Sequence, residues 1–171
     1  MPDVVSVDLV TDESRPILVR LWQLYMHDLS EFRGTMPDAE GQYATERLAT
    51  FFDDPDRACY LIRHGSNIAG LALIRGVSSE PRVMGEFFIV RGARRHGVGY
   101  QAAVALLSAH PGRWEIAFQE QNTTAARFWR QVATDVVGTT CVEERRPIPG
   151  KPDLRPDTWL VLTTPAPPGH P

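Results

Sequence analysis

The order of hydrophobic and polar residues predicts a strand and two helices in the first third of the chain. Residues 4–10 are rich in valine and partly alternate between apolar and polar side chains, which is typical of a strand. Apolar side chains then recur at helical spacing from Ile17 to Leu29, and Pro16 suits the first turn of a helix. A second, weaker helix is predicted over residues 42–52.

The rest of the chain alternates between strand and helix patterns. Apolar runs joined by short turns predict an antiparallel meander of three strands, at 58–63, 67–75 and 82–90. After the meander we expect helices and strands in alternation, at 98–110, 114–119, 123–133, 136–143 and 157–164. This order predicts an α+β fold, a mixed α/β sheet with helices on both faces.

Length and composition are those of one globular domain. The chain has 171 residues, of which 43% are hydrophobic and 23% are charged. Eight of the 14 prolines lie from Pro147 onward, and proline donates no hydrogen bond to a sheet. We therefore expect a single domain over residues 1–164, followed by a proline-rich tail over 165–171.

Charge and cysteine content argue against several classes of function. The net charge of −3 disfavours a nucleic-acid-binding protein, which is normally basic. There is no apolar run of membrane-spanning length and no pattern of a signal peptide, so we expect a cytoplasmic protein that does not bind membranes. Cys59 and Cys141 lack the spacing of zinc ligands, so no metal site is expected. A monomer and a homodimer are equally compatible with the sequence.

The segment from Glu86 to Tyr100 combines a strand, a basic loop and two glycines that begin a helix. The first N–H groups of a helix have no partner within it, and the positive end of its dipole attracts anions. Arg91, Arg94 and Arg95 add positive charge to the loop. Alternatively, the glycines only permit close packing and the arginines are solvated. The combined pattern favours a site for a phosphate-bearing ligand.

The glycines also match a dinucleotide-binding pattern, Gly97-x-Gly99-x-x-Ala102. In that fold the first glycine follows its strand almost at once, whereas Gly97 lies seven positions after Val90 and the strand follows an antiparallel meander. Glu120 lies where an acid that binds the ribose is expected. A nucleotide-cofactor oxidoreductase therefore stays as a weaker alternative.

Two motifs resemble those of the GNAT superfamily of N-acetyltransferases. The first matches the superfamily signature R/Q-x-x-G-x-G/A and reads Arg94-x-x-Gly97-x-Gly99. The second follows at the expected distance and reads Asn122-x-x-Ala125-x-x-Phe128-Trp129. The resemblance covers most of the chain and implies a central, twisted, mostly antiparallel sheet of about seven strands. Residues 24–32, 86–88 and 128–129 further resemble a bacterial subgroup of predicted acetyltransferases.

The resemblance implies acetyl-coenzyme A (acetyl-CoA) as the co-substrate. Backbone groups of Phe88, Ile89 and Val90 would pair with the pantetheine arm as with an added strand. The pyrophosphate would bind to the loop that Arg94 begins, at the backbone N–H groups of Arg95, His96, Gly97, Val98, Gly99 and Tyr100. Asn122 would either reach the pantetheine or stabilise the following loop, and Ala125 and Phe128 would pack against the ligand.

Glu86 is the candidate catalytic base that would take the proton of the amine. It lies on the same strand face as Val90, and Met84, Phe87 and Phe88 flank it, so burial would raise its pKa. Alternatively, Glu86 pairs structurally with an arginine. Trp129 stands where many relatives have a tyrosine that protonates the leaving thiolate, and an indole is no acid at neutral pH. Tyr25 and Tyr100 are other candidate acids.

The acceptor amine would enter beside the first two helices, by analogy with the superfamily. Tyr25, Asp28 and Glu31 are the candidate residues there, and an acidic, aromatic mouth would suit a cationic amine. A solvated helix end explains the two acids equally well. The predicted function is N-acyl transfer from acetyl-CoA to the primary amine of a small molecule or protein. The alternative is a non-catalytic module that binds acyl-CoA.

Overall fold

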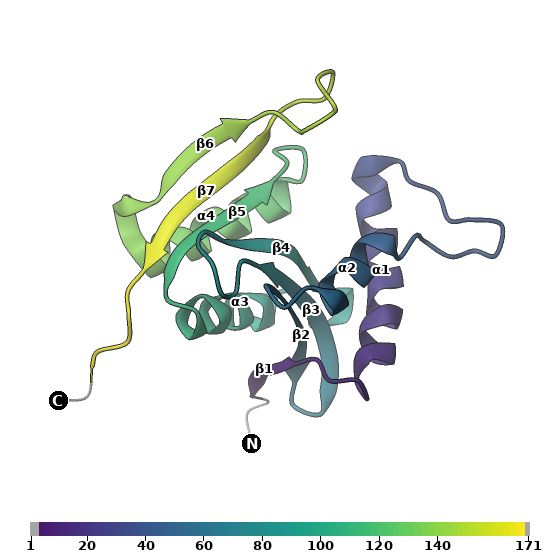
Figure 1. The fold of residues 1–171 in the computed structure, drawn as a ribbon, viewed down its shortest axis with the longest axis horizontal. Coiled ribbons are helices and arrows are strands. Elements are labelled where there is room, and N and C mark those ends of the chain that lie inside the picture. Colours follow the sequence, from purple (N-terminus) through teal and green to yellow (C-terminus); the bar gives the residue numbers. More distant parts are fainter. Residues whose placement is uncertain (1–3, 170–171) are drawn as a thin grey trace.

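The computed structural model describes residues 4–169 of the protein (Figure 1). Residues 1–3 and 170–171, at the ends of the predicted domain and tail, lie outside the described residues. The strands are β1 (Val5–Leu9), β2 (Arg57–His64), β3 (Asn67–Arg75), β4 (Arg82–Ile89), β5 (Gly112–Phe118), β6 (Val142–Arg146) and β7 (Asp157–Thr164). The α-helices are α1 (Arg15–Arg33), α2 (Glu46–Asp53), α3 (Val98–Ala109) and α4 (Thr123–Val137).

One mixed sheet organises these elements, in the strand order β1-β2-β3-β4-β5-β7-β6. Every neighbouring pair is antiparallel except β4 and β5, which run parallel. α3 and α4 lie on one face, and α1 and α2 lie on the other (Figure 1). The predicted fold class, a mostly antiparallel sheet of seven strands between helices, is therefore confirmed.

The sheet separates two apolar cores. The larger core lies under α3 and α4 and includes Leu106, Trp114 and Leu160. The smaller core lies under α1 and α2 and includes Trp22 and Leu73. Within residues 4–169, this smaller core takes no residue from β5, β6 or β7. The face that α1 and α2 cover is therefore packed by helices beside β2 to β4 only.

Two elements differ from the sequence predictions by several residues. α2 begins at Glu46 rather than 42, because side chains of α1 hold the preceding backbone extended: Trp22 Nε1 donates to the Ala44 carbonyl at 2.9 Å, and the Tyr43 N–H donates to Gln23 Oε1 at 2.7 Å. The strand predicted at 136–143 forms only at Val142–Arg146. Its valines instead extend α4, where they pack on the larger core until Gly138 ends the helix.

Candidate active site

β4 and β5 diverge after three paired residues. The pairing ends with Met84 opposite Ile116, so the rest of β4 is bonded to β3 alone. The Val90 N–H donates to the Ala69 carbonyl of the β3 side at 2.8 Å. Because neighbouring residues of a strand direct their backbone groups to opposite sides, the N–H and C=O groups of Ile89 face the opening. Of the three residues predicted to pair with pantetheine, Ile89 thus presents its groups best, although Arg94 Nε already donates to its carbonyl at 2.8 Å.

A β-bulge directs Glu86 into the smaller core. Leu73 pairs with Glu86 and the next residue, Ile74, pairs with Met84, so Gly85 is the extra residue of β4. Met84 consequently belongs to the larger core, on the opposite face. The expectation that Met84 flanks Glu86 is therefore wrong, because simple alternation holds only where a strand has no bulge.

Glu86 is 7% exposed and contacts side chains from both α1 and α2. Tyr25 donates its hydroxyl hydrogen bond to Glu86 Oε2, and Arg47 Nε lies 3.2 Å from Glu86 Oε1. Burial raises the pKa of Glu86, against the opposing effects of Arg47 and Tyr25. Burial and the charge of Glu86 hold the pKa of Tyr25 well above its usual value, so Tyr25 stays protonated at neutral pH. The arrangement fits both the basic and the structural role for Glu86.

The loop between β4 and α3 has the backbone shape of an anion site. Arg95 and Gly97 both have positive φ, at 65° and 75°, and α3 begins at Val98. Within the described part of the chain, no backbone carbonyl accepts a hydrogen bond from the N–H groups of residues 95–100. A Cβ at Gly99 would lie 3.2 Å from Ile89 Cγ1, a tight contact, so that position favours glycine. These free donors at a helix start suit a phosphate group.

Two arginines of this loop form ion pairs with an acid of α1. Arg94 and Arg91 lie 2.5 Å and 2.9 Å from the two carboxylate oxygens of Asp28. Asp28, predicted for the acceptor site, is therefore paired with the predicted cofactor loop, and Glu31 is exposed near the end of α1. Arg95, the third arginine of the loop, is exposed and has no ion-pair partner among the described residues.

The second motif stabilises α4 and the larger core. Asn122 accepts a hydrogen bond from the Ala125 N–H at 3.1 Å and so caps the helix. Phe128 stacks on Phe87 with ring centroids 5.7 Å apart, and Trp129 is buried at 5% exposure. Trp129 therefore packs in the core and brings no hydroxyl to the opening. Of the other candidate acids, Tyr100 is exposed and has a raised pKa because of a hydrogen bond with Asp135 of α4, whereas Tyr25 bonds to Glu86.

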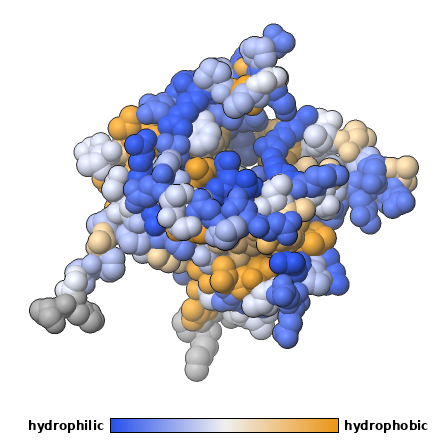
Figure 2. All heavy atoms as spheres, viewed as in Figure 1, coloured by the Kyte–Doolittle hydropathy of each residue, from blue (hydrophilic) through white to orange (hydrophobic). Residues whose placement is uncertain are grey.

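Sequence reasoning missed two charged residues near the opening, Arg47 and Asp157. Arg47 of α2 contacts Glu86. Asp157 is the first residue of β7 and lies on the other side of the splay, the gap that opens where β4 and β5 diverge. The surface is hollowed between the β6–β7 hairpin and α1, with hydrophilic side chains around the hollow (Figure 2). No local pattern marks these residues, because their proximity to the site depends on the order of the strands and the packing of α2.

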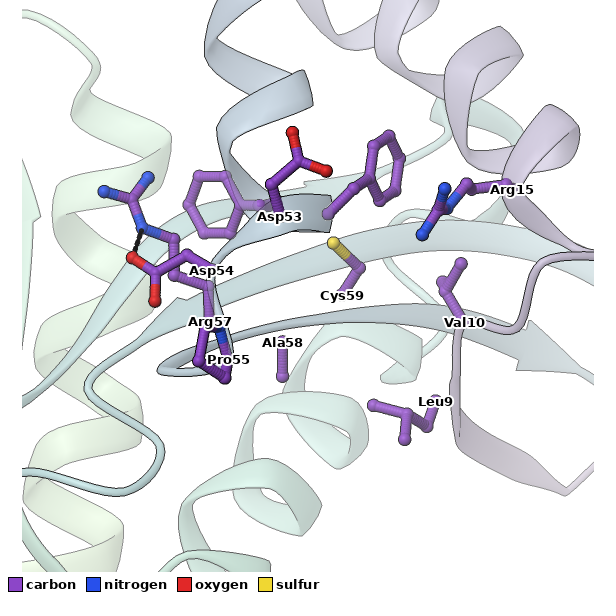
Figure 3. A pocket seen from close by; sticks show the side chains of 11 residues that line it. Leu9, Val10, Arg15, Asp53, Asp54, Pro55, Arg57, Ala58 and Cys59 are labelled. Carbon is purple, nitrogen blue, oxygen red and sulfur yellow. Dashed lines mark hydrogen bonds and ion pairs between the residues drawn. The ribbon is translucent and has the colours of Figure 1, made fainter.

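A separate cavity of about 370 Å³ lies at the other end of α1 and α2 (Figure 3). The Cys59 thiol points toward the space between Asp53 and Arg15 in this view. Burial raises the pKa of Cys59 to about 11, so the thiol is no nucleophile at neutral pH. This cavity contains none of the predicted site residues.

The described residues form neither a cluster of metal ligands nor a helix able to cross a membrane. Among residues 4–169, no three His, Cys, Asp or Glu side chains gather closely enough to hold a metal ion. Within the same range, none of the helices combines the length and the apolar character that crossing a bilayer requires.

Comparisons with known proteins agree with the geometry. A family model described as the acetyltransferase (GNAT) family matches residues 18–133. No curated protein matches significantly. An acetyltransferase from Thermus thermophilus is 19% identical, with a TM-score of 0.68 over 95% of this chain and 99% of that one.

Two further solved structures have the same fold at lower identity. Spermidine N-acetyltransferase from Vibrio cholerae, in complex with CoA and spermine, is 10% identical, with a TM-score of 0.66 over 94% of this chain and 95% of its own. A probable acetyltransferase from Staphylococcus epidermidis is 11% identical, with a TM-score of 0.65 over 94% and 99%. With two thirds of its length matched by the family model, the chain belongs to the acetyltransferase (GNAT) family.

Proposed function

We propose that the protein is an N-acetyltransferase that moves an acetyl group from acetyl-CoA to the primary amine of a small molecule or protein. The observation that carries this proposal is the run of unbonded N–H groups at residues 95–100, beside the open edge of β4. The loop donors suit the pyrophosphate, and the strand edge suits the amides of pantetheine. A thioester placed this way would point into the splay between β4 and β5.

In the proposed reaction the amine nitrogen attacks the thioester carbonyl carbon directly. The new C–N bond forms, the C–S bond breaks, and the thiolate leaves as CoA. A lysine-like amine has a pKa near ~10.4, so only about one in two thousand is neutral at pH 7 and a base is needed. Glu86 would accept that proton, and its raised pKa brings it closer to the task than an exposed carboxylate. Solvent would protonate the thiolate, since Trp129 is buried in the core.

A second candidate is a module that binds acyl-CoA without catalysis. It is favoured by the burial of Trp129 and by the occupation of both Glu86 oxygens by Tyr25 and Arg47. This candidate shares the cofactor site and differs only in turnover. The nucleotide-cofactor alternative has less support, because the strand before the loop pairs antiparallel with β3.

The test measures binding and turnover separately. CoA and NAD are titrated in thermal unfolding, where a ligand at 100 times its dissociation constant adds about 2.7 kcal/mol. Release of free thiol from acetyl-CoA is then followed over a panel of primary amines. Stabilisation by CoA together with amine-dependent thiol release supports the enzyme. Stabilisation by CoA with no release over the whole panel supports the binding module, and stabilisation by NAD alone would overturn both.

A further inference from the structure

β7 begins with an acid that faces the opening from the side opposite Glu86. Thr158, Leu160 and Leu162 of β7 are buried, and the two leucines pack in the larger core under α3 and α4. Because side chains alternate along a strand, Asp157 lies on the other face of the sheet, the face that carries Glu86. It is also adjacent to the end of β5, where Phe118 pairs with Thr158. Asp157 thus borders the splay on its β5–β7 side.

One oxygen of this carboxyl group is buried without a hydrogen bond. Asp157 Oδ1 has no partner within the described residues. Its cross-strand neighbour Arg146 is committed elsewhere, to Glu115 at 2.6 Å and to Glu144 at 2.6 Å. Since a buried acceptor without a partner costs free energy, such a group in a native structure needs an explanation.

Other carboxylates on this face are already paired. Both oxygens of Glu86 are bound by Tyr25 and Arg47, and both oxygens of Asp28 are bound by arginines. Glu115 contacts Arg146 as well as an arginine of its own strand. Asp157 differs from these paired carboxylates in having a buried oxygen without a hydrogen-bond partner, in the part of the chain that the structure describes.

One positive charge acts on Asp157 and on the proposed base alike. The guanidinium of Arg33, at the end of α1, acts to lower the pKa of Tyr25, Glu86 and Asp157. Burial nevertheless raises the pKa of Asp157, against Arg33 and a hydrogen bond from Gln119. A cation that bound beside Asp157 would relieve this cost of burial.

We propose that Asp157 is a specificity residue that binds a second, non-reacting cationic group of the acceptor amine. The proposal rests on the proposed acetyl transfer and names its substrate class, amines that carry another positive charge. The reacting nitrogen must lose its proton before it attacks, and a carboxylate beside it would oppose that loss. A separate ammonium or guanidinium keeps its charge throughout, so it suits Asp157 on one side of the opening while the reacting amine lies toward Glu86.

The test compares two amines of equal chain length, 1,4-diaminobutane and butylamine, with acetyl-CoA as donor. The variants are Asp157→Asn and, as a matched control in the same hairpin, Asp153→Asn, which alters an exposed acid. We expect Asp157→Asn to raise KM for the diamine about tenfold or more, with kcat and the butylamine kinetics unchanged. Asp153→Asn should behave as wild type. Equal losses for both amines, or no loss for either, would overturn the proposal.

A calorimetric titration of the CoA-bound protein with the diamine separates this proposal from the proposed function. If the diamine binds to wild type and binds about tenfold more weakly to Asp157→Asn, the site stands even where no acetyl transfer occurs. If wild type transfers acetyl groups but its diamine affinity does not depend on Asp157, the inference fails and the proposed function survives. Thermal unfolding of each variant verifies that it is folded, and CoA affinity verifies that the cofactor site is intact.

Discussion

The two halves of the sheet are built differently. Strands β2 to β4 are packed on both faces, by α1 and α2 on one side and α3 on the other. Strands β5 and β7 pack with one face only, on the larger core under α3 and α4, and the other face of β5, β7 and β6 carries charged pairs. There Arg146 lies 2.6 Å from Glu115 and 4.8 Å from the ring centroid of Trp159.

This difference explains where the molecule opens. The β4 side of the splay is backed by an apolar core, which holds Glu86 and Tyr25 in fixed positions. The β5–β7 side is polar and leaves Asp157 incompletely bonded. In the proposed enzyme, the rigid side would position the base and the polar side would recognise the substrate.

The largest expected effect is the loss of activity when the carboxylate of Glu86 is removed, in the part of the sheet that is packed on both faces. Glu86→Gln keeps the shape of the side chain but removes the proton acceptor, so kcat should fall by about 100- to 10,000-fold. CoA affinity should be unchanged, because the cofactor loop is not altered. Glu13→Gln, which alters an exposed acid in the turn before α1, is the control. Full activity of Glu86→Gln would leave Glu86 with a structural role only.

The next effect compares how much the two faces of strands β5 and β7 contribute to stability. Trp114 of β5 is fully buried and donates a hydrogen bond to the His110 carbonyl at 2.8 Å, whereas Trp159 of β7 is partly exposed. Trp114→Ala should lower the free energy of unfolding by about 3–5 kcal/mol, and Trp159→Ala by about 1 kcal/mol. Urea denaturation measures both. Similar losses would show that the charged face is packed as firmly as the core.

A smaller effect decides between the two predicted roles of Asn122. As the cap of α4, its removal in Asn122→Ala should cost about 1 kcal/mol of stability and leave CoA affinity unchanged. Thr45→Ala is the matched control, because the side chain of Thr45 makes no capping bond to α2. A clear loss of CoA affinity with unchanged stability would favour contact with the pantetheine instead.

The smallest effect concerns acid stability in the packed half. Hydrogen bonds from Ser79 and Ser78 lower the pKa of Asp56 to about 2, below its value in an unfolded chain. Its stabilising contribution is therefore complete above pH ~4 and is lost as the pH falls toward 2. Asp56→Asn should flatten the decline of stability across this range, measured by chemical denaturation at each pH. Asp53→Asn, an exposed acid nearby, should leave that decline unchanged.

Local patterns sufficed for much of the fold. The strands at 67–75 and 157–164 form over the predicted residues, because alternation and bounding turns are properties of the segment itself. The start of α3 after Gly97 follows from its two glycines for the same reason. The strand predicted from residue 136 was wrong at its start, since the valines there belong to α4 and β-branched residues also occur on the buried face of a helix.

The candidate site depended more on contacts between distant segments. The bulge at Gly85, the pairing of Asp28 with Arg94 and the approach of Arg47 to Glu86 all join segments far apart in the chain. Such contacts are fixed by register and packing, which periodicity does not encode. The anion loop could be predicted because one short segment contains all of it. The position of Asp157 could not, because it depends on the pairing of β7 with β5.

The most direct test of the account is a titration of isotope-labelled protein with CoA, followed through the backbone amide resonances. If the N–H groups of residues 95–100 bind the pyrophosphate, their signals should shift most, and those of Cys59 and Asp53 at the separate cavity should stay in place. Binding of CoA that leaves the amides of residues 95–100 unchanged would contradict the account.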